Sequence, residues 1–144
     1  MNVYFLGTGT SQGIPVIGSN HPVCKSQDPR DQRLRVSIWI EWEAFSMVID
    51  CGPDFRQQML VSKCERLDAL LFTHEHADHT AGLDDIRPFY FYQGKISVYA
   101  HERVMLNLAK RFDYIFEDEN KYPGAPSVNQ HIVLENETFE LGNK

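Results

Sequence analysis

The chain has 144 residues, of which 42% are hydrophobic and 24% charged, and its formal net charge at pH 7 is −6. The length predicts one domain, and the composition is that of a packed protein rather than a disordered chain. The negative charge disfavours a general binder of nucleic acids or of anionic membranes. No apolar run approaches the roughly 20 residues that span a bilayer. The 3 unevenly spaced cysteines predict no disulfide framework, and therefore a reducing, cytoplasmic location.

Strand-like and helix-like segments alternate along the chain. The alternating or continuous apolar pattern of strands covers 2–6, 34–42, 45–49, 67–72, 96–100, 132–134 and 138–141. Helices are predicted from Pro53 to about Ser62, from near Ala81 to before Pro88, and over 102–112. This order predicts an α/β layered domain. The loop over 11–32 is longer than compact domains usually contain without a function.

A cluster of metal-ligand residue types follows the apolar segment 67–72, where the chain reads Thr-His-Glu-His-Ala-Asp-His from Thr73. Because residues two apart in an extended segment point the same way, His74 and His76 are expected to converge on one metal ion. Asp78 and His79 are adjacent, project differently and suit a second ion. Imidazole and carboxylate ligands fit Zn²⁺, Mn²⁺ or Fe²⁺ better than Ca²⁺. This spacing predicts a metal site at the end of a buried strand.

The pattern His-x-His-x-Asp-His after a buried strand resembles the signature of the metallo-β-lactamase fold superfamily. Residues 5–10 resemble the opening strand and glycine turn of its tRNA-processing and phosphodiesterase branches, and residues 48–54 resemble its strand ending in Asp-x-Gly. Residues 81–87 resemble the segment after the motif in the cyclic-phosphate phosphodiesterases of phosphonate breakdown, as do 15–18 and 28–31. The resemblance covers nearly the whole chain.

The resemblance implies a site and an activity. His74 and His76 would bind one divalent ion, Asp78 and His79 a second, and Asp50 would orient a ligand imidazole, unless it is a simple turn carboxylate. Asp78 is also the expected catalytic residue, which orients the attacking water. The implied activity is that of a metal-dependent hydrolase, a phosphodiesterase whose hydroxide, held by two Zn²⁺ or Mn²⁺ ions (or Fe²⁺), attacks a small phosphorylated or cyclic-phosphate substrate.

A structural metal site is a weaker expectation. The similar phosphodiesterases hold a structural zinc with Cys-x-Cys-x-x-Cys in the loop after the first strand. Here Ser19 and His21 replace the first two cysteines, and Cys24 remains. A closed zinc site takes four ligands, so His21 and Cys24 supply two at most, and an ordinary loop histidine and free cysteine are favoured.

The remaining polar residues have open interpretations. Glu75 lies between two inward-pointing ligands and is expected to point away from them. Asp84, Asp85 and Arg87 either line a substrate path, with Arg87 meeting a phosphate, or form a solvated helix face. His101 is expected to cap a helix.

Two alternatives remain open from the sequence. One is an RNA-processing endonuclease of the same fold, against which the acidic chain counts. The other is a catalytically incomplete metal-binding or interaction domain, because the superfamily's site also uses a later His, a bridging Asp and a final His, and nothing after His79 matches them.

The expected fold class is α/β, a metallo-β-lactamase-like αβ/βα sandwich of which this chain resembles the N-terminal half, one mixed β-sheet with flanking helices. Residues 1–144 are thus expected to be a single domain truncated at its C-terminus, with the missing ligands beyond Lys144. Half of such a sandwich leaves the apolar face of its sheet exposed. Either the missing C-terminal half or a second copy of the chain, in a homodimer, would cover this face.

Overall fold

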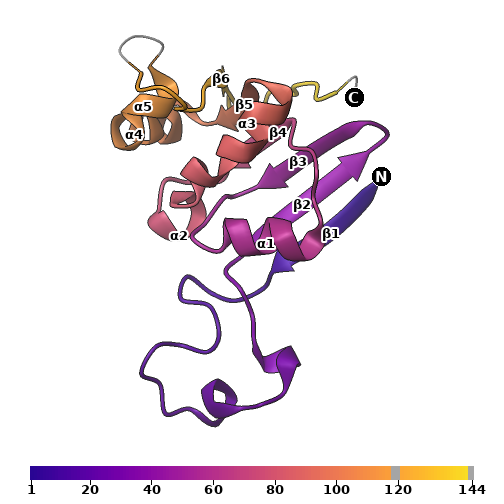
Figure 1. Cartoon of the computed structure of the whole chain (residues 1–144), viewed down its shortest axis with the longest axis vertical. Coiled ribbons are helices and arrows are strands. Elements are labelled where there is room, and N and C mark those ends of the chain that lie inside the picture. Colours follow the sequence, from indigo (N-terminus) through magenta and orange to yellow (C-terminus); the bar gives the residue numbers. More distant parts are fainter. Residues whose placement is uncertain (118–120, 143–144) are drawn as a thin grey trace.

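The computed structural model describes residues 1–117 and 121–142. Within these residues, six strands form one sheet in the order β1-β2-β3-β4-β5-β6 (Figure 1). Their bounds are Asn2–Gly7, Ser37–Trp42, Phe45–Ile49, Ala69–Phe72, Ile96–Ala100 and Val128–Ile132. β1, β2 and β3 are antiparallel neighbours, whereas β3, β4, β5 and β6 run parallel. The sheet is therefore mixed, as predicted, and the carboxyl ends of its parallel strands meet at one edge.

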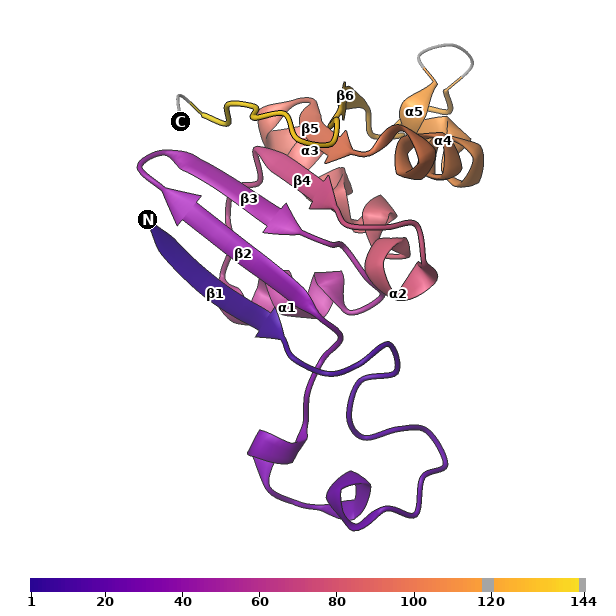
Figure 2. The same cartoon turned by 180° about the vertical axis from the view of Figure 1, so that it is seen from behind.

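Helices connect the parallel strands, as parallel pairs require. The α-helices are α1 Phe55–Ser62, α2 Ala77–Thr80, α3 Arg87–Gln93, α4 Glu102–Arg111 and α5 Asp113–Phe116. The 3₁₀ turns are η1 Pro22–Lys25, η2 Pro29–Asp31 and η3 Leu83–Ile86. Seen from the two opposite sides, the helices lie over one face of the sheet (Figure 2). No helix in the described ranges is long and apolar enough to cross a membrane.

The main core lies between the helices and this face. Alternate strand residues point into it, and Val48, Leu70 and Val98 of adjacent strands are fully buried there. The amphipathic helix α4 contributes Val104 and Leu108, at the spacing that places side chains on one helical face. The helix-covered side of the sheet is thus a packed core that fixes the strand ends.

The helix-free face carries the other apolar residues of the same strands. Met47 and Ala69 are buried on this face, but Phe5 of the edge strand β1 is 71% exposed. The chain after β6 crosses part of this face, where Phe139 stacks on Tyr99 with ring centroids 5.5 Å apart. Within the described residues this face is therefore only partly covered.

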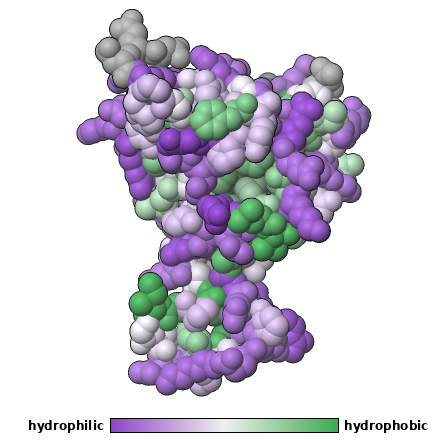
Figure 3. Space-filling model, viewed as in Figure 1, coloured by the Kyte–Doolittle hydropathy of each residue, from purple (hydrophilic) through white to green (hydrophobic). Residues whose placement is uncertain are grey.

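Hydrophobic side chains also reach the surface over α1, where Figure 3 shows a green patch. Leu60 and Val61 of this helix are 58% and 69% exposed. The loop that contains η1 and η2 projects away from the sheet, and its Ile17 is 98% exposed (Figure 1).

Three predicted elements are wrong. The helix expected to end before Pro88 is instead the turn η3, and α3 begins at Arg87 with Pro88 in its first turn. A proline fits there because the first helical N–H groups have no intrahelical partner. The strand expected at 132–134 lies at Val128–Ile132, and 138–141 is not a strand. β6 is an edge strand with four of its five residues exposed, so it has no apolar alternation to reveal it.

Candidate metal centre

The candidate ligands lie where the parallel strand β4 ends. After Phe72 the chain bends at Thr73 and continues without regular secondary structure to His76, which is extended (φ −64°, ψ 152°) and precedes the one-turn helix α2. The cluster therefore sits at the carboxyl edge of the parallel strands, the usual place for ligands in α/β sheets.

Three of the predicted ligands converge. One donor atom from each of His74, His76 and Asp78 lies within 4.8 Å of the other two. The imidazole centroids of His74 and His76 are 4.7 Å apart. In residues 1–117 and 121–142, no other group of three or more His, Cys, Asp or Glu side chains has this geometry. The structure thus brings together His74 and His76, which the spacing predicts will converge, and adds Asp78, which the sequence analysis places at a second ion.

His79 adjoins the same group. Its Nε2 is 3.2 Å from Asp78 Oδ2, and its ring centroid is 4.0 Å from that of His74. Its Nδ1 lies 2.7 Å from Asp50 Oδ2. A hydrogen bond donated by Nδ1 to this carboxylate leaves the lone pair of Nε2 on the side of the cluster, which is the tautomer that binds metals.

Asp50 connects three segments of the centre. It ends β3 in the left-handed region, at φ 61°, and is 3% exposed. Its carboxylate accepts hydrogen bonds from the Thr73 backbone N–H at 2.9 Å and from the Thr73 hydroxyl at 2.7 Å. With His79 as the third partner, Asp50 holds both the start and the end of the ligand segment.

Glycines allow these segments to pack backbone against backbone. A Cβ at Gly52 would lie 2.1 Å from the carbonyl oxygen of Asp78, and one at Gly82 would lie 2.2 Å from the Gly52 carbonyl oxygen. The Cys51 N–H donates to the His79 carbonyl at 2.8 Å. The turn after β3 and the ligand segment therefore pack backbone against backbone, and Gly52 is needed for this close approach. The resemblance to Asp-x-Gly indicates that a glycine belongs at this position, but the sequence alone does not explain why.

Thr80 is the last residue of α2, and its side chain is buried in the protein interior. It is fully buried, and its hydroxyl donates to the His76 carbonyl at 2.9 Å while accepting from Arg111 Nη1 at 3.0 Å. We expect Thr80→Val, which keeps the side-chain shape, to lower the free energy of unfolding by about 1–2 kcal/mol, because the hydrogen bonds of the buried hydroxyl with the His76 carbonyl and with Arg111 Nη1 are lost. Urea unfolding measures this. The control Thr10→Val, at an exposed position, should change it by less than about 0.5 kcal/mol, and equal losses in both variants would contradict the role of Thr80.

This donor set fits a transition-metal ion. Three imidazoles and a carboxylate are ligands that Zn²⁺, Mn²⁺ and Fe²⁺ accept, and the second nitrogen of His79 is oriented by a buried carboxylate as in known metal sites. The residues therefore suit the group that the sequence predicts.

His21 and Cys24 lie in the projecting loop, apart from the cluster (Figure 1). His21 Nδ1 accepts from the Val23 N–H at 3.3 Å and caps η1. Hydrogen bonds from Ser19 and from the Val16 N–H lower the pKa of the Cys24 thiol. Within the described ranges, His21 and Cys24 belong to no group of three or more metal-ligating side chains.

Arg87 does not face the cluster. Its Nη2 donates to Asp84 Oδ1 at 2.6 Å and to the Tyr122 hydroxyl at 2.8 Å. The Tyr114 hydroxyl donates to the same carboxylate at 3.0 Å, and burial together with this contact raises the pKa of Tyr114 to about 12. These contacts join α3 to α5 and to the loop before β6. Arg87 therefore does not meet a substrate at the cluster, and it is not part of a freely solvated helix face either.

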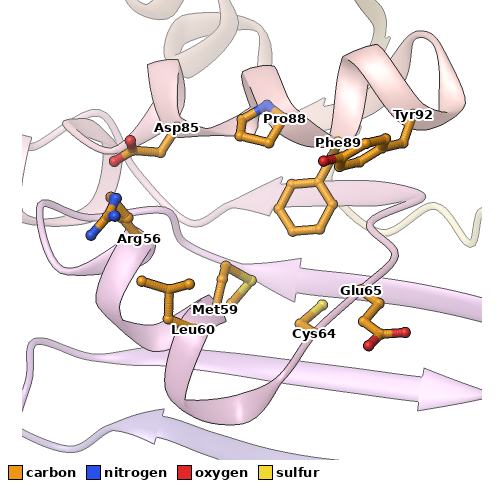
Figure 4. Close-up of a pocket in the computed structure, with 9 residues that line it drawn as sticks. All are labelled: Arg56, Met59, Leu60, Cys64, Glu65, Asp85, Pro88, Phe89 and Tyr92. Carbon is orange, nitrogen blue, oxygen red and sulfur yellow. The ribbon is translucent and has the colours of Figure 1, made fainter.

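Asp85 lines a separate cavity of about 500 Å³ between α1 and α3 (Figure 4). Arg56 lies beside it at one end and Glu65 at the other, with the Phe89 ring and Met59 between them. Burial raises the pKa of Asp85. None of the candidate metal ligands lines this cavity.

Comparison with known proteins places the chain among metallo-hydrolase folds. A family model described as the beta-lactamase superfamily domain matches residues 46–144. An octanoyltransferase of Porphyromonas gingivalis is 44% identical over 99% of this chain and 29% of its own length. Ribonuclease Z of Clostridium kluyveri is 32% identical over 58% of this chain and 23% of its own. The crystal structure of a diphosphatase from the PhnP family matches with a TM-score of 0.85 and 38% identity, over 96% of this chain and 53% of that one.

These similarities confirm the predicted superfamily and fold class. The chain spans less than a third of the curated relatives and about half of the diphosphatase.

Proposed function

Because the chain belongs to the family of the beta-lactamase superfamily domain, we propose that it forms the ligand-bearing part of a metal-dependent hydrolase, a phosphodiesterase acting on a small phosphorylated or cyclic-phosphate substrate. The convergence of His74, His76 and Asp78 beside a carboxylate-oriented His79 carries the proposal. The similarity to a diphosphatase supports phosphoryl chemistry. Octanoyl transfer is not proposed, because the match covers 29% of that relative and the metal-ligand cluster supports hydrolysis rather than acyl transfer.

Each of the four candidate ligands has a role in the proposed reaction. His74 and His76 hold one ion, and Asp78 and His79 hold the second. Divalent ions at such a site lower the pKa of a water molecule and neutralise charge on phosphoryl oxygens. Asp78 Oδ2 faces His79, and the other carboxylate oxygen accepts a hydrogen bond from the attacking water and orients it. Since the imidazoles bind metal only when neutral, metal loading and activity fall at acidic pH.

Metal binding and hydrolysis test the proposal together. We expect calorimetry to show tight binding of Zn²⁺ or Mn²⁺, and the loaded protein to hydrolyse bis(p-nitrophenyl) phosphate. Asp78→Ala should lower the rate by at least about 100-fold and weaken metal binding, because several kcal/mol of charge stabilisation is lost. His131→Gln is the control, because this histidine lies on the exposed edge strand β6, and it should change neither the rate of hydrolysis nor metal binding. Equal rates or equal metal affinity for wild type and Asp78→Ala would reject the proposal.

A second candidate is an RNA-processing endonuclease. The 32% identity to ribonuclease Z of C. kluyveri, over 58% of the chain, supports it. The net charge of −6 counts against it, because binding an RNA backbone needs cationic contacts. Cleavage of a precursor tRNA, with little hydrolysis of the small diester, would favour this candidate.

A third candidate is a metal-binding domain that is catalytically incomplete on its own. The chain spans 53% of the diphosphatase that it resembles, and the superfamily's later ligands have no match after His79. Two tightly held ions with hydrolysis favour the enzyme, whereas one weakly held ion without hydrolysis favours the incomplete domain.

A further inference from the structure

A hollow of about 550 Å³ adjoins the candidate metal centre. Thr73 at the end of β4, His101 and Arg103 at the start of α4, and residues 133–135 after β6 line it. Because β4, β5 and β6 are parallel, these residues meet at the same sheet edge as the cluster. Thr73 Oγ1 is 3.0 Å from His74 Nδ1, so the hollow begins one residue from a candidate ligand.

An ion pair brings Arg103 from α4 to the ligand segment. Its Nη2 lies 3.3 Å from Oε2 of Glu75, the residue between His74 and His76. This oxygen is buried and has no hydrogen bond, so the guanidinium is its charge partner. The Arg103 side chain is 68% exposed, which leaves most of its N–H donors open to the hollow or to solvent. A guanidinium with free donors matches the geometry of a phosphoryl group.

His101 presents a second donor at the same rim. It ends the strand β5, and its Nδ1 accepts from the Arg103 backbone N–H at 3.3 Å. In a neutral imidazole whose Nδ1 accepts, the proton is on Nε2, which therefore donates. His101 caps α4, as predicted, and is exposed.

The rest of the lining limits where an anion can bind. Val104, Val133 and Leu134 are apolar, and Glu135 places a carboxylate in the hollow. An anion is repelled at Glu135 and attracted at Arg103, so it binds on the side next to the metal centre.

We propose that Arg103 and His101 form a subsite for a second phosphoryl group of the substrate, next to the phosphoryl group held at the metal centre. The inference rests on the proposed function and narrows its substrate to compounds with two neighbouring phosphoryl groups. Glu75 acts as a positioning residue, which holds Arg103 against the ligand segment.

Inorganic pyrophosphate tests the subsite in the metal-free chain, where no bound ion contributes to affinity. In an NMR titration at fixed salt, we expect pyrophosphate to bind more tightly than inorganic phosphate. Arg103→Gln should weaken pyrophosphate binding about tenfold, as for one exposed charge-assisted contact, and Glu135→Gln should strengthen it. The control Arg30→Gln, in the projecting loop with an 88% exposed side chain, should leave it unchanged.

Zinc titration of the same variants separates the two proposals. Arg103→Gln should retain the zinc affinity of the wild type, at a lower melting temperature because Glu75 Oε2 loses its charge partner. If the chain binds zinc and Arg103→Gln leaves its affinity for pyrophosphate unchanged, the subsite is overturned. A chain that binds pyrophosphate through Arg103 but binds no zinc supports the subsite and overturns the proposed function.

Discussion

Asp50→Ala should both destabilise the protein and weaken zinc binding at the candidate metal centre. The carboxylate is buried and accepts from the Thr73 N–H, the Thr73 hydroxyl and His79 Nδ1 at 2.9, 2.7 and 2.7 Å. Alanine leaves the backbone and imidazole donors without an acceptor, and its Cβ remains at φ 61°. We expect a loss of about 3–5 kcal/mol in the free energy of unfolding and at least about tenfold weaker zinc binding, since His79 loses its orientation.

Urea unfolding and zinc calorimetry measure the two effects, and two controls separate them. Asp50→Asn keeps one acceptor oxygen and tolerates the left-handed backbone, so it should lose less stability. Asp68→Ala removes a carboxylate that accepts from the Ser46 N–H at 2.8 Å at the opposite end of β4. It should cost stability while leaving zinc affinity intact. A folded Asp50→Ala protein with wild-type zinc affinity would show that Asp50 has no part in the centre.

Gly52→Ala should be nearly as disruptive, although it adds a single methyl group. The new Cβ would lie 2.1 Å from the Asp78 carbonyl oxygen and 3.0 Å from its carbonyl carbon. Neither segment can move freely, because the Cys51 N–H donates to the His79 carbonyl and the Gly82 N–H donates to the Cys51 carbonyl. We expect a loss of about 3 kcal/mol or more, and weaker zinc binding because Asp78 must shift.

Thermal unfolding and zinc titration measure this, with Gly18→Ala as the control. Gly18 has φ +72° and no atom within 4 Å of an added Cβ, so its substitution introduces backbone strain without a clash. That strain should cost about 1–2 kcal/mol and leave zinc binding unchanged. Equal zinc affinity in Gly52→Ala and wild type would contradict the close packing of the two segments.

The sequence predicts those features that depend on local pattern. The strand at Phe45–Ile49 coincides with β3, because alternating or continuous apolar residues reveal a strand without knowledge of its neighbours. The pairing of His74 with His76 was likewise predictable from their spacing of two residues, whereas Asp78, expected at a second ion, joins them from the helix α2. Their occupancy by metal stays a prediction.

Features that depend on distant contacts were not predictable. The partners of Asp50 are 23 and 29 residues away in sequence, so only the resemblance indicates that Asp50 orients a ligand imidazole, and Arg103 reaches Glu75 from the helix α4. No periodicity encodes such pairs. The same reason explains the misplaced β6, whose position is fixed by its pairing with β5 rather than by its own composition.

The compactness of the centre in sequence has a consequence for folding. The hydrogen bond between Asp50 and His79 joins residues 29 apart in sequence, and all four candidate ligands lie within residues 74–79, at the C-terminal end of this loop. Closing this loop costs less conformational entropy than closing a longer one, and contacts of lower sequence separation form earlier. One β-α-β unit, from β3 through α1 and β4 to α2, therefore contains all four candidate ligands together with the carboxylate that orients one of them. We therefore expect this unit to begin to form before β5, β6 and α4 join the sheet, with the contacts of Glu75 and Thr80 to α4 added afterwards.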